Sequence, residues 1–236
     1  MKMRISYILV NNTVPENAGA AARALKTMGF NDLRFVNPCD YLCEKAMMLA
    51  HGSHDILYNA KVYDSLSDAL ADIDFSIATS SKQRWVRKNE ISVNRLKSFI
   101  EDKGDTVQEL AIVFGGEESG LSNEDIALCD VVSSVQLAGS YPSLNLAQAV
   151  MIYTYSLSGI GLGNFGGQNA KNPQHTAYKP LKEKVIKVLN GIGLPPETLI
   201  HGRVLERLAN ANEQDINLLH SITTKIIERV EGELDK

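Results

Sequence analysis

Apolar runs of strand length recur from the N-terminus to residue 137, and segments of helical spacing lie between most of them. The runs are Ile5–Val10, Leu33–Val36, Ile73–Ala78, Leu110–Phe114 and Val131–Leu137. Parallel strands need crossover connections, and helices then cover both faces of the sheet. The alternation therefore predicts an α/β fold with a mostly parallel sheet, closed by a helix over residues 144–157.

Residues 159–180 break this pattern, because they are rich in Gly, Asn, Gln and Pro and have no periodicity. Such a stretch predicts a linker. Three amphipathic segments follow at 181–194, 196–211 and 213–234 and predict a small group of helices. We therefore expect a first domain over 1–160, a linker over 161–180 and a helical extension over 181–236.

Three linker glycines, Gly161, Gly163 and Gly166, spell the dinucleotide-binding pattern G-x-G-x-x-G. That pattern binds a pyrophosphate only between a strand and the N-terminus of a helix. Here it follows a predicted helix and leads into a polar stretch, so we interpret these glycines as flexible chain.

The composition of the 236 residues, 44% hydrophobic and 22% charged, is that of a soluble globular protein. No apolar stretch approaches the roughly 18 residues that span a bilayer, and the N-terminus lacks the features of a signal peptide. We therefore expect a cytoplasmic protein without a membrane partner. The three cysteines match neither a disulfide framework nor a four-ligand zinc site, so no metal is expected.

A net charge of -4 and a pI of about 5.8 argue against a protein that coats nucleic acid by bulk electrostatics. A local basic patch remains compatible with these values. Residues 81–88, SKQRWVRK, place four cations around the only tryptophan. This stretch is either a nucleic-acid contact or a solvated loop.

The first candidate loop, residues 11–30, leads from a strand into an alanine-rich helix. Ala21, Ala24, Leu25 and Met28 have helical spacing and predict the core stripe, so Arg23 lies off that stripe, with Gly19 beside it. Open α/β sheets bind ligands at the carboxyl ends of their strands, where this loop lies. Arg23 is therefore either a ligand-binding cation or an ordinary surface arginine.

The second candidate loop begins where a buried strand ends at Phe114. Gly115 and Gly116 permit a close backbone approach, and two acidic residues, Glu117 and Glu118, follow. The next helix starts with an S-x-x-D capping box at Ser122. This loop is either a ligand site or a tight turn without a ligand.

The third candidate loop leads into the helix over 144–157 and has two polar residues, Ser143 and Asn145, where N-caps stand. Capping accounts for one of them. The sequence therefore leaves a hydroxyl or an amide available for a ligand.

Together the three loops resemble the three motifs of the SpoU/TrmH family of RNA ribose 2'-O-methyltransferases, in the SPOUT superfamily. Motif one, N-x-G-x-x-x-R, is met by Asn17, Gly19 and Arg23; motif two is 114–121 and motif three is 143–145. The resemblance covers roughly residues 1–158. Within the family, the sequence is most similar to the tRNA (cytidine/uridine-2'-O-)-methyltransferases.

The resemblance implies a trefoil-knotted α/β domain that binds S-adenosylmethionine, and a homodimer with active sites at its interface. It implies that main chain holds the cofactor at Thr79, Ser80, Ser81, Gly115, Val135, Leu137, Ser143 and Leu144. It also implies a catalytic Arg23 surrounded by Asn17, Glu117, Ser143 and Asn145, with Glu118 as the alternative to Glu117.

The resulting hypothesis is S-adenosylmethionine-dependent methylation of a ribose 2'-hydroxyl in RNA, with tRNA as the preferred partner. The alternatives are rRNA as substrate, a base nitrogen as acceptor, and an RNA-binding protein without catalysis. Phosphate contacts are expected from Arg4, Lys26 and the stretch 81–88. The basic residues of the extension either bind RNA or lie on a packed or solvated bundle, and we favour the second; they are Lys182, Lys184, Lys187, Arg203 and Arg207.

Overall fold

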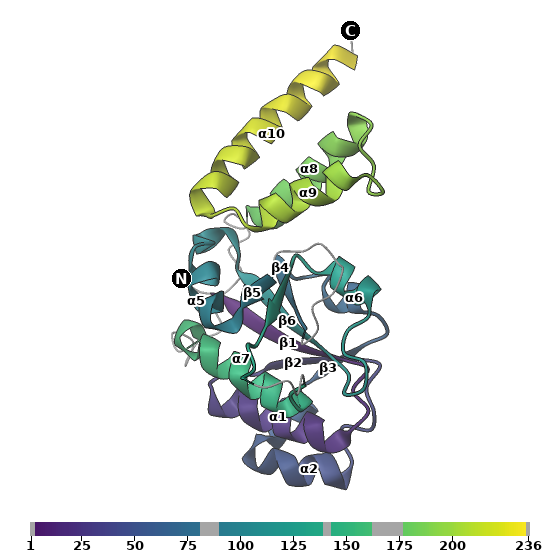
Figure 1. The fold of residues 1–236 in the computed structure, drawn as a ribbon, viewed down its shortest axis with the longest axis vertical. Coiled ribbons are helices and arrows are strands. Elements are labelled where there is room, and N and C mark those ends of the chain that lie inside the picture. Colours follow the sequence, from purple (N-terminus) through teal and green to yellow (C-terminus); the bar gives the residue numbers. More distant parts are fainter. Residues whose placement is uncertain (1–2, 81–89, 139–142, 162–176, 235–236) are drawn as a thin grey trace.

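The computed structural model of the chain describes residues 3–80, 90–138, 143–161 and 177–234. Its centre is a seven-stranded sheet in the order β3-β2-β1-β6-β4-β7-β5, in which every described pairing is parallel (Figure 1). The strands are β1 (Arg4–Val10), β2 (Asp32–Val36), β3 (Lys61–Tyr63), β4 (Phe75–Thr79), β5 (Glu90–Ser92), β6 (Glu109–Gly115) and β7 (Val131–Ser134). The predicted α/β fold with a parallel sheet is confirmed.

The five apolar runs all contain strands, and the two strands that the pattern missed are the edge strands β3 and β5. Each has three residues and none of them is buried, so neither produces an apolar run. Strand β7 ends at Ser134, before the predicted Leu137, and β4 begins at Phe75, after the predicted Ile73. The five central strands therefore lie in the segments that the hydrophobic pattern identified.

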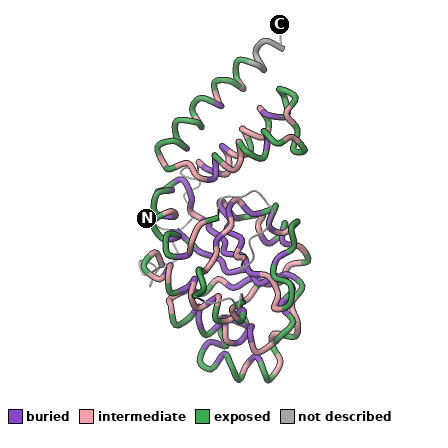
Figure 2. The backbone as a smooth tube through the Cα atoms, viewed as in Figure 1, coloured by how far each residue is buried: buried purple, intermediate pink, exposed green. Residues whose placement is uncertain are grey.

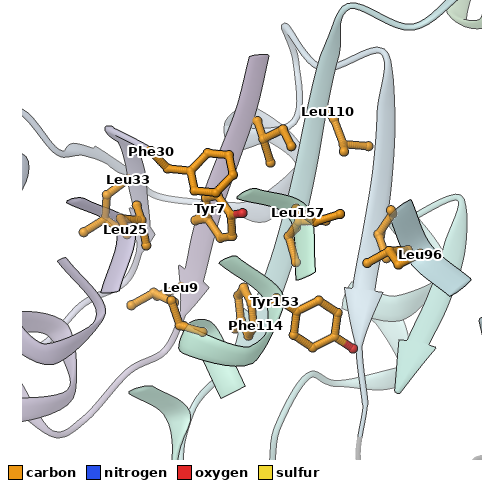
Figure 3. Packing of buried hydrophobic residues seen from close by; sticks show 14 of the residues in the cluster. Tyr7, Leu9, Leu25, Phe30, Leu33, Leu96, Leu110, Phe114, Tyr153 and Leu157 are labelled. Carbon is orange, nitrogen blue, oxygen red and sulfur yellow. The ribbon is translucent and has the colours of Figure 1, made fainter. Parts of the chain in front are cut away.

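Helices cover both faces of this sheet. They are α1 (Pro15–Thr27), α2 (Glu44–Ala50), α3 (His54–Tyr58), α4 (Leu66–Ala69), α5 (Val93–Glu101), α6 (Asn123–Leu128) and α7 (Leu146–Gly161), with 3-10 turns η1 (His51–Ser53) and η2 (Gly104–Thr106). The larger apolar cluster joins the sheet to α1, α5 and α7, and the smaller one joins it to α4 and α6. Figure 3 shows the first cluster, in which Tyr153 of α7 meets the Phe114 ring edge-on, with centroids 5.4 Å apart.

The small residues of α1 allow close helix packing. Ala21, Ala24 and Leu25 are buried as predicted, and Met28 is half-buried at the end of the helix. Gly19 does not share the exposed side with Arg23, contrary to the prediction. It is buried under α2, where an added Cβ would lie 2.0 Å from the carbonyl oxygen of Ala46, so only glycine permits this contact.

The C-terminal part forms three helices, α8 (Tyr178–Gly191), α9 (Leu199–Ala209) and α10 (Glu213–Leu234). Helix α8 begins inside the stretch predicted as a linker. Both other helices pack on α8, and Figures 1 and 2 show the group projecting from one end of the sheet, largely exposed. Within the described ranges, no helix combines the length and apolar character needed to cross a bilayer.

The extension attaches at the amino ends of the central strands. Asp130, which precedes β7, accepts hydrogen bonds from the Tyr178 hydroxyl (3.0 Å) and the Lys182 ammonium (2.5 Å). The buried Lys103, which precedes β6, donates to the carbonyl oxygens of Ala209 (2.5 Å) and Ala211 (2.6 Å). Two buried polar contacts therefore join the helical extension to the sheet.

Candidate active site

A cavity of about 280 Å³ opens at the carboxyl ends of β4, β6 and β7. Its lining comes from the three loops that leave these strands and from the start of α7. The lining residues are Thr79, Ser80, Phe114, Gly115, Gly116, Glu117, Glu118, Ser119, Gly120, Leu121, Val135, Leu137, Ser143, Leu144, Leu146, Ala149 and Tyr153. The position follows the rule that open parallel sheets bind ligands at this edge.

The residues predicted to bind the cofactor meet in this cavity. All of those that the structure describes are part of the lining, namely Thr79, Ser80, Gly115, Val135, Leu137, Ser143 and Leu144. Ser81 lies outside the described residues. The remainder of the lining includes an apolar wall of Phe114, Leu121, Leu146, Ala149 and Tyr153.

The glycine-rich turn after β6 fits a ligand cradle. Gly116 and Gly120 form an isolated antiparallel bridge that folds the turn back on itself. A Cβ on Gly115 would lie 2.1 Å from both Gly120 C and Leu121 N, so a side chain would force this turn open. Main-chain polar groups beside an apolar wall suit a ligand with a flat apolar ring and polar substituents. The residues present therefore fit S-adenosylmethionine.

Three predicted catalytic residues form one hydrogen-bonded chain beside the cavity. The Asn17 amide donates to Glu117 Oε1 at 2.7 Å, and the Asn145 amide donates to Asn17 Oδ1 at 2.9 Å. Glu117 Oε2 accepts from the backbone N–H of Thr13 at 2.9 Å and from its hydroxyl at 3.2 Å. Residues from three loops far apart in sequence are thus held together.

Asn145 also caps α7. The Asn145 Oδ1 accepts the backbone N–H of Ala147 at 2.9 Å, and the backbone N–H of Asn145 donates to the Gln148 side chain at 3.1 Å. The side chain of Asn145 therefore connects the N-terminus of α7 to Asn17. Ser143 is exposed and lines the cavity.

The two adjacent glutamates occupy different surroundings. Glu117 is half-buried within the hydrogen-bonded chain, whereas Glu118 is exposed and lines the cavity. Burial raises the pKa of Glu117, but hydrogen bonds from Asn17 and Thr13 outweigh it and lower the pKa below its ordinary value. Glu117 is consequently a carboxylate at neutral pH.

Arg23 lies apart from this group within one chain. It follows Asn17 by six residues, which places the two side chains about 120° apart around the axis of α1. Arg23 is exposed, does not line the cavity, and its guanidinium contacts no hydrogen-bonding or ionic partner among the described residues. The structure therefore brings together Asn17, Glu117 and Asn145 but not Arg23.

Thr13 is the member of the site that sequence reasoning missed. It lies in the polar loop between β1 and α1, where no periodicity marks one residue above another. Close by, the Asn12 amide contacts the Cys39 sulfur at 3.1 Å. Burial and the nearby charge of Glu117 raise the pKa of the Cys39 thiol, so it remains protonated at neutral pH and is a poor nucleophile.

Several of the basic residues named in the sequence analysis contact partners within the chain, and phosphate binding by them stays a prediction. Arg4 pairs with Glu109, and Lys26 pairs with Asp55 at 2.6 Å. In the extension, Lys182 and Lys184 bond to Asp130 and Thr224, whereas Arg203 and Arg207 are exposed. The basic stretch 81–88 lies outside the described residues.

Among the described residues, no group of three or more His, Cys, Asp or Glu side chains is placed to hold a metal ion.

Sequence profiles of known families match both parts of the chain. The profile of the SpoU rRNA methylase family matches residues 4–155, and that of the C-terminal domain of the tRNA/rRNA methyltransferase LasT matches residues 175–230. The chain belongs to the SpoU methylase family. It is a member of a methyltransferase family, as the three motifs predicted.

Two relatives illustrate the similarity of this SpoU methylase chain. LasT of Escherichia coli (strain K12), an uncharacterised tRNA/rRNA methyltransferase, is 38% identical over 93% of this chain and 96% of its own. TrmJ of Methanocaldococcus jannaschii, a tRNA (cytidine-2'-O-)-methyltransferase, is 37% identical over 66% of this chain and 68% of its own. The SpoU methylase chain is therefore similar to tRNA methyltransferases over most of its length.

Solved structures match the fold of the SpoU methylase chain. TrmJ from Z. mobilis ZM4 superposes with a TM-score of 0.64 at 28% identity, over 94% of this chain and 98% of that one. AviRb from Streptomyces viridochromogenes, a SpoU methyltransferase crystallised with AdoMet, superposes with a TM-score of 0.53 at 21% identity, over 69% of this chain and 59% of its own. The second likeness is one of fold alone.

Proposed function

We propose that this chain transfers a methyl group from S-adenosylmethionine to a ribose 2'-hydroxyl of RNA, with tRNA as the substrate. One observation carries the proposal. The cavity that gathers the described cofactor-binding candidates lies beside the hydrogen-bonded Asn17, Glu117 and Asn145. Family membership and the names of the tRNA 2'-O-methyltransferase relatives support it.

The proposed cofactor supplies an electrophilic methyl group on a sulfonium when it is bound. Main-chain groups of the three loops would hold its polar atoms, and the apolar wall of the cavity would hold its purine. The turn at Gly115 keeps this space clear of side chains. The chain's own contribution is to bind and orient, because the reactive methyl group is the cofactor's.

A ribose 2'-hydroxyl is a poor nucleophile at neutral pH, so the protein must position it and stabilise the charge that develops. Arg23 is proposed to do this through the phosphate of the target nucleotide, since a guanidinium offers a planar pair of donors. A role for Arg23 as the base is chemically demanding, because the pKa of arginine lies above about 12. We therefore assign it electrostatic orientation.

A homodimer is part of the proposal, with each active site completed by the second copy. Arg23 is exposed and lies outside the cavity of its own chain, which supports a role at a site shared between two chains. We also propose that the backbone around the cavity forms the trefoil knot that the family resemblance implies. A tRNA substrate places the reaction in the cytoplasm.

The substrate is proposed to be tRNA in preference to rRNA. The relatives whose names specify a ribose modification act on tRNA, as in TrmJ of M. jannaschii and Citrobacter koseri. The extension has a family profile of its own, from a tRNA/rRNA methyltransferase, which supports an RNA substrate of either kind. Exposed Arg203 and Arg207 on α9 are cations there that remain available to a phosphate backbone.

Arg23 variants test the proposal. Purified protein is incubated with methyl-labelled S-adenosylmethionine and unmodified tRNA or rRNA, and cofactor affinity is measured in parallel by calorimetry. We expect Arg23→Ala to lower turnover by about 100-fold and Arg23→Lys by about tenfold, because lysine lacks the fork. Cofactor affinity should stay unchanged in both, since Arg23 does not line the cavity.

Two results would contradict parts of this account. Near-full turnover of Arg23→Lys would exclude bidentate orientation by the guanidinium. A wild-type protein that neither binds S-adenosylmethionine nor labels RNA would be an RNA-binding protein without catalysis.

A further inference from the structure

The carboxylate of Glu117 has both oxygens occupied by donors from the loop after β1 and the first turn of α1. Oε1 accepts the Asn17 amide, and Oε2 accepts both donors of Thr13, its backbone N–H and its hydroxyl. The carboxylate therefore acts as a fixed acceptor between the loop after β1 and the loop after β6. A carboxylate bound in this way is poorly placed to remove a proton from a substrate.

We infer that Thr13 is a positioning residue for the methyl-transfer reaction, and that it acts through Glu117. The inference rests on the proposed function. Thr13 fixes the carboxylate, the carboxylate fixes Asn17, and Asn17 fixes Asn145 at the start of α7.

The direction of each hydrogen bond supports this order. An ionised carboxylate only accepts, so Asn17 must present its amide N–H to Glu117 and its oxygen to Asn145. Asn145 then donates to Asn17 and uses its own oxygen to accept from Ala147 at the N-terminus of α7. The Glu117 carboxylate thus sets the orientation of the Asn17 and Asn145 amides. Ser143 and Leu144, which line the cavity, directly precede Asn145 in the sequence.

Close packing of the two loops makes the Thr13 contact possible. A Cβ on Gly116 would lie 2.2 Å from the carbonyl oxygen of Asn11, two residues before Thr13. Glycine at 116 therefore lets the two chain segments approach until Thr13 reaches Glu117. Because both loops leave adjacent parallel strands, β1 and β6, small shifts there are resisted by the sheet.

The charge state of Glu117 agrees with a fixed acceptor. Burial raises its pKa, whereas Asn17 and the Thr13 donors lower it further than burial raises it. Cys39 is the titratable neighbour from the loop after β2, and burial together with the charge of Glu117 raises its thiol pKa. Removing the Thr13 hydroxyl should therefore raise the pKa of Glu117, with Cys39 still protonated.

The experiment compares Thr13→Val with Thr13→Ser, which retains the hydroxyl. The matched control is Thr223→Val, because among the described residues the Thr223 hydroxyl bonds only to carbonyls of its own helix α10. We expect Thr13→Val to lower kcat by about tenfold, the effect of one charge-assisted hydrogen bond, with little change in KM for S-adenosylmethionine. The acid limb of its kcat profile should move to higher pH, and Thr13→Ser should restore both readouts to within about twofold.

A double variant separates action through Glu117 from a general loss of structure. Glu117→Gln alone should lower kcat at least as much as Thr13→Val, and the double variant should be no worse than Glu117→Gln alone. Additive losses, or a Thr13→Val enzyme indistinguishable from Thr223→Val, would overturn the inference.

Carbon NMR titration of Glu117 gives a readout that needs no substrate. Thr13→Val should raise the Glu117 pKa relative to wild type, and an unchanged pKa would overturn the inference. If wild type methylated no RNA while the pKa shift appeared, the proposed function would fail and the Thr13–Glu117 link would stand.

Discussion

Gly116 occupies a position where a side chain would not fit. The space that a Cβ would need is filled by the Asn11 carbonyl oxygen, 2.2 Å away. This backbone contact cannot move without shifting either β1 or the loop that bears Glu117. At residue scale, the site thus depends on the missing side chain of Gly116 as much as on the polar groups around it.

Gly116→Ala is predicted to separate Glu117 from Thr13 and Asn17. We expect the free energy of unfolding to fall by about 1–3 kcal/mol, the usual cost of overpacking, and the affinity for S-adenosylmethionine to fall by at least tenfold. Denaturant unfolding and calorimetry measure the two effects. Gly52→Ala is the control, because no atom lies within 4 Å of its added Cβ; equal behaviour of the two variants would refute the packing argument.

Most of the site candidates that the sequence indicates lie at one cavity or in the hydrogen-bonded chain beside it, and the exceptions have physical reasons. The cofactor candidates were identified because glycines, caps and strand ends mark loops that a ligand can reach. Thr13 was missed because its role depends on a carboxylate more than a hundred residues away, which no local pattern encodes. Arg23 was identified as a residue, yet its distance from the cavity depends on how α1 is rotated in three dimensions.

At the scale of elements, one buried lysine contacts the C-terminal end of a helix of the extension. Lys103 lies just after α5, donates to carbonyls at the end of α9, and approaches the rings of Phe75, Phe99 and Tyr178. A cation near the C-terminus of a helix interacts favourably with its unpaired carbonyls. The same burial lowers the pKa of Lys103 to about 8, against the raising effects of Asp130 and Asp102.

This shift predicts a pH dependence of stability. Below about pH 8 Lys103 is charged in the folded and the unfolded chain, and the folded chain bears the cost of burial. Between about pH 8 and the ordinary value of 10.5, the folded chain loses the proton first, so its stability rises with pH by about 3 kcal/mol in total. Unfolding of wild type and Lys103→Met at pH 8, 9 and 10 measures this; parallel pH curves would contradict it.

The two edge strands could not be predicted from the hydrophobic pattern. Strands β3 and β5 have no buried residue, so their pairing with β2 and β7 is fixed by the sheet and not by their own composition. The start of α8 was missed for another reason. Tyr178 and Leu181 are buried against the domain, but the stretch before them is too rich in Asn, Gln and Gly to show helical spacing.

At the scale of the whole molecule, the sheet separates the cavity from the helical extension. The cavity lies at the carboxyl ends of the strands, and the extension is joined to their amino ends through Asp130 and Lys103. The extension therefore does not close over the cavity of its own chain. An RNA that contacts both must span the sheet or reach across to a second copy.

Asp130→Asn tests this separation. The carboxylate accepts from Ser76, Tyr178 and Lys182, so we expect the free energy of unfolding to fall by about 2–3 kcal/mol and amide exchange in α8 to accelerate. Cofactor affinity should not change, because the cavity is at the opposite edge. Asp55→Asn, which breaks the exposed pair with Lys26, should cost less than about 1 kcal/mol; a loss of cofactor binding in Asp130→Asn would refute the separation.

The overall fold was the level best predicted from sequence, since alternating strands and helices permit few arrangements. A parallel sheet followed from apolar runs such as Ile5–Val10, whereas the strand order required the observed pairing of β1 with β6. Neither the knot nor the homodimer follows from periodicity. Both remain predictions of the family resemblance.

The most direct test of the central claim is to identify the methylated nucleoside. Wild type and Arg23→Ala are incubated with labelled S-adenosylmethionine and unmodified tRNA, and the RNA is digested and its nucleosides resolved by mass. The account predicts a 2'-O-methylnucleoside with wild type that is lost with Arg23→Ala. A label on a base, or no label in the tRNA despite bound cofactor, would contradict it.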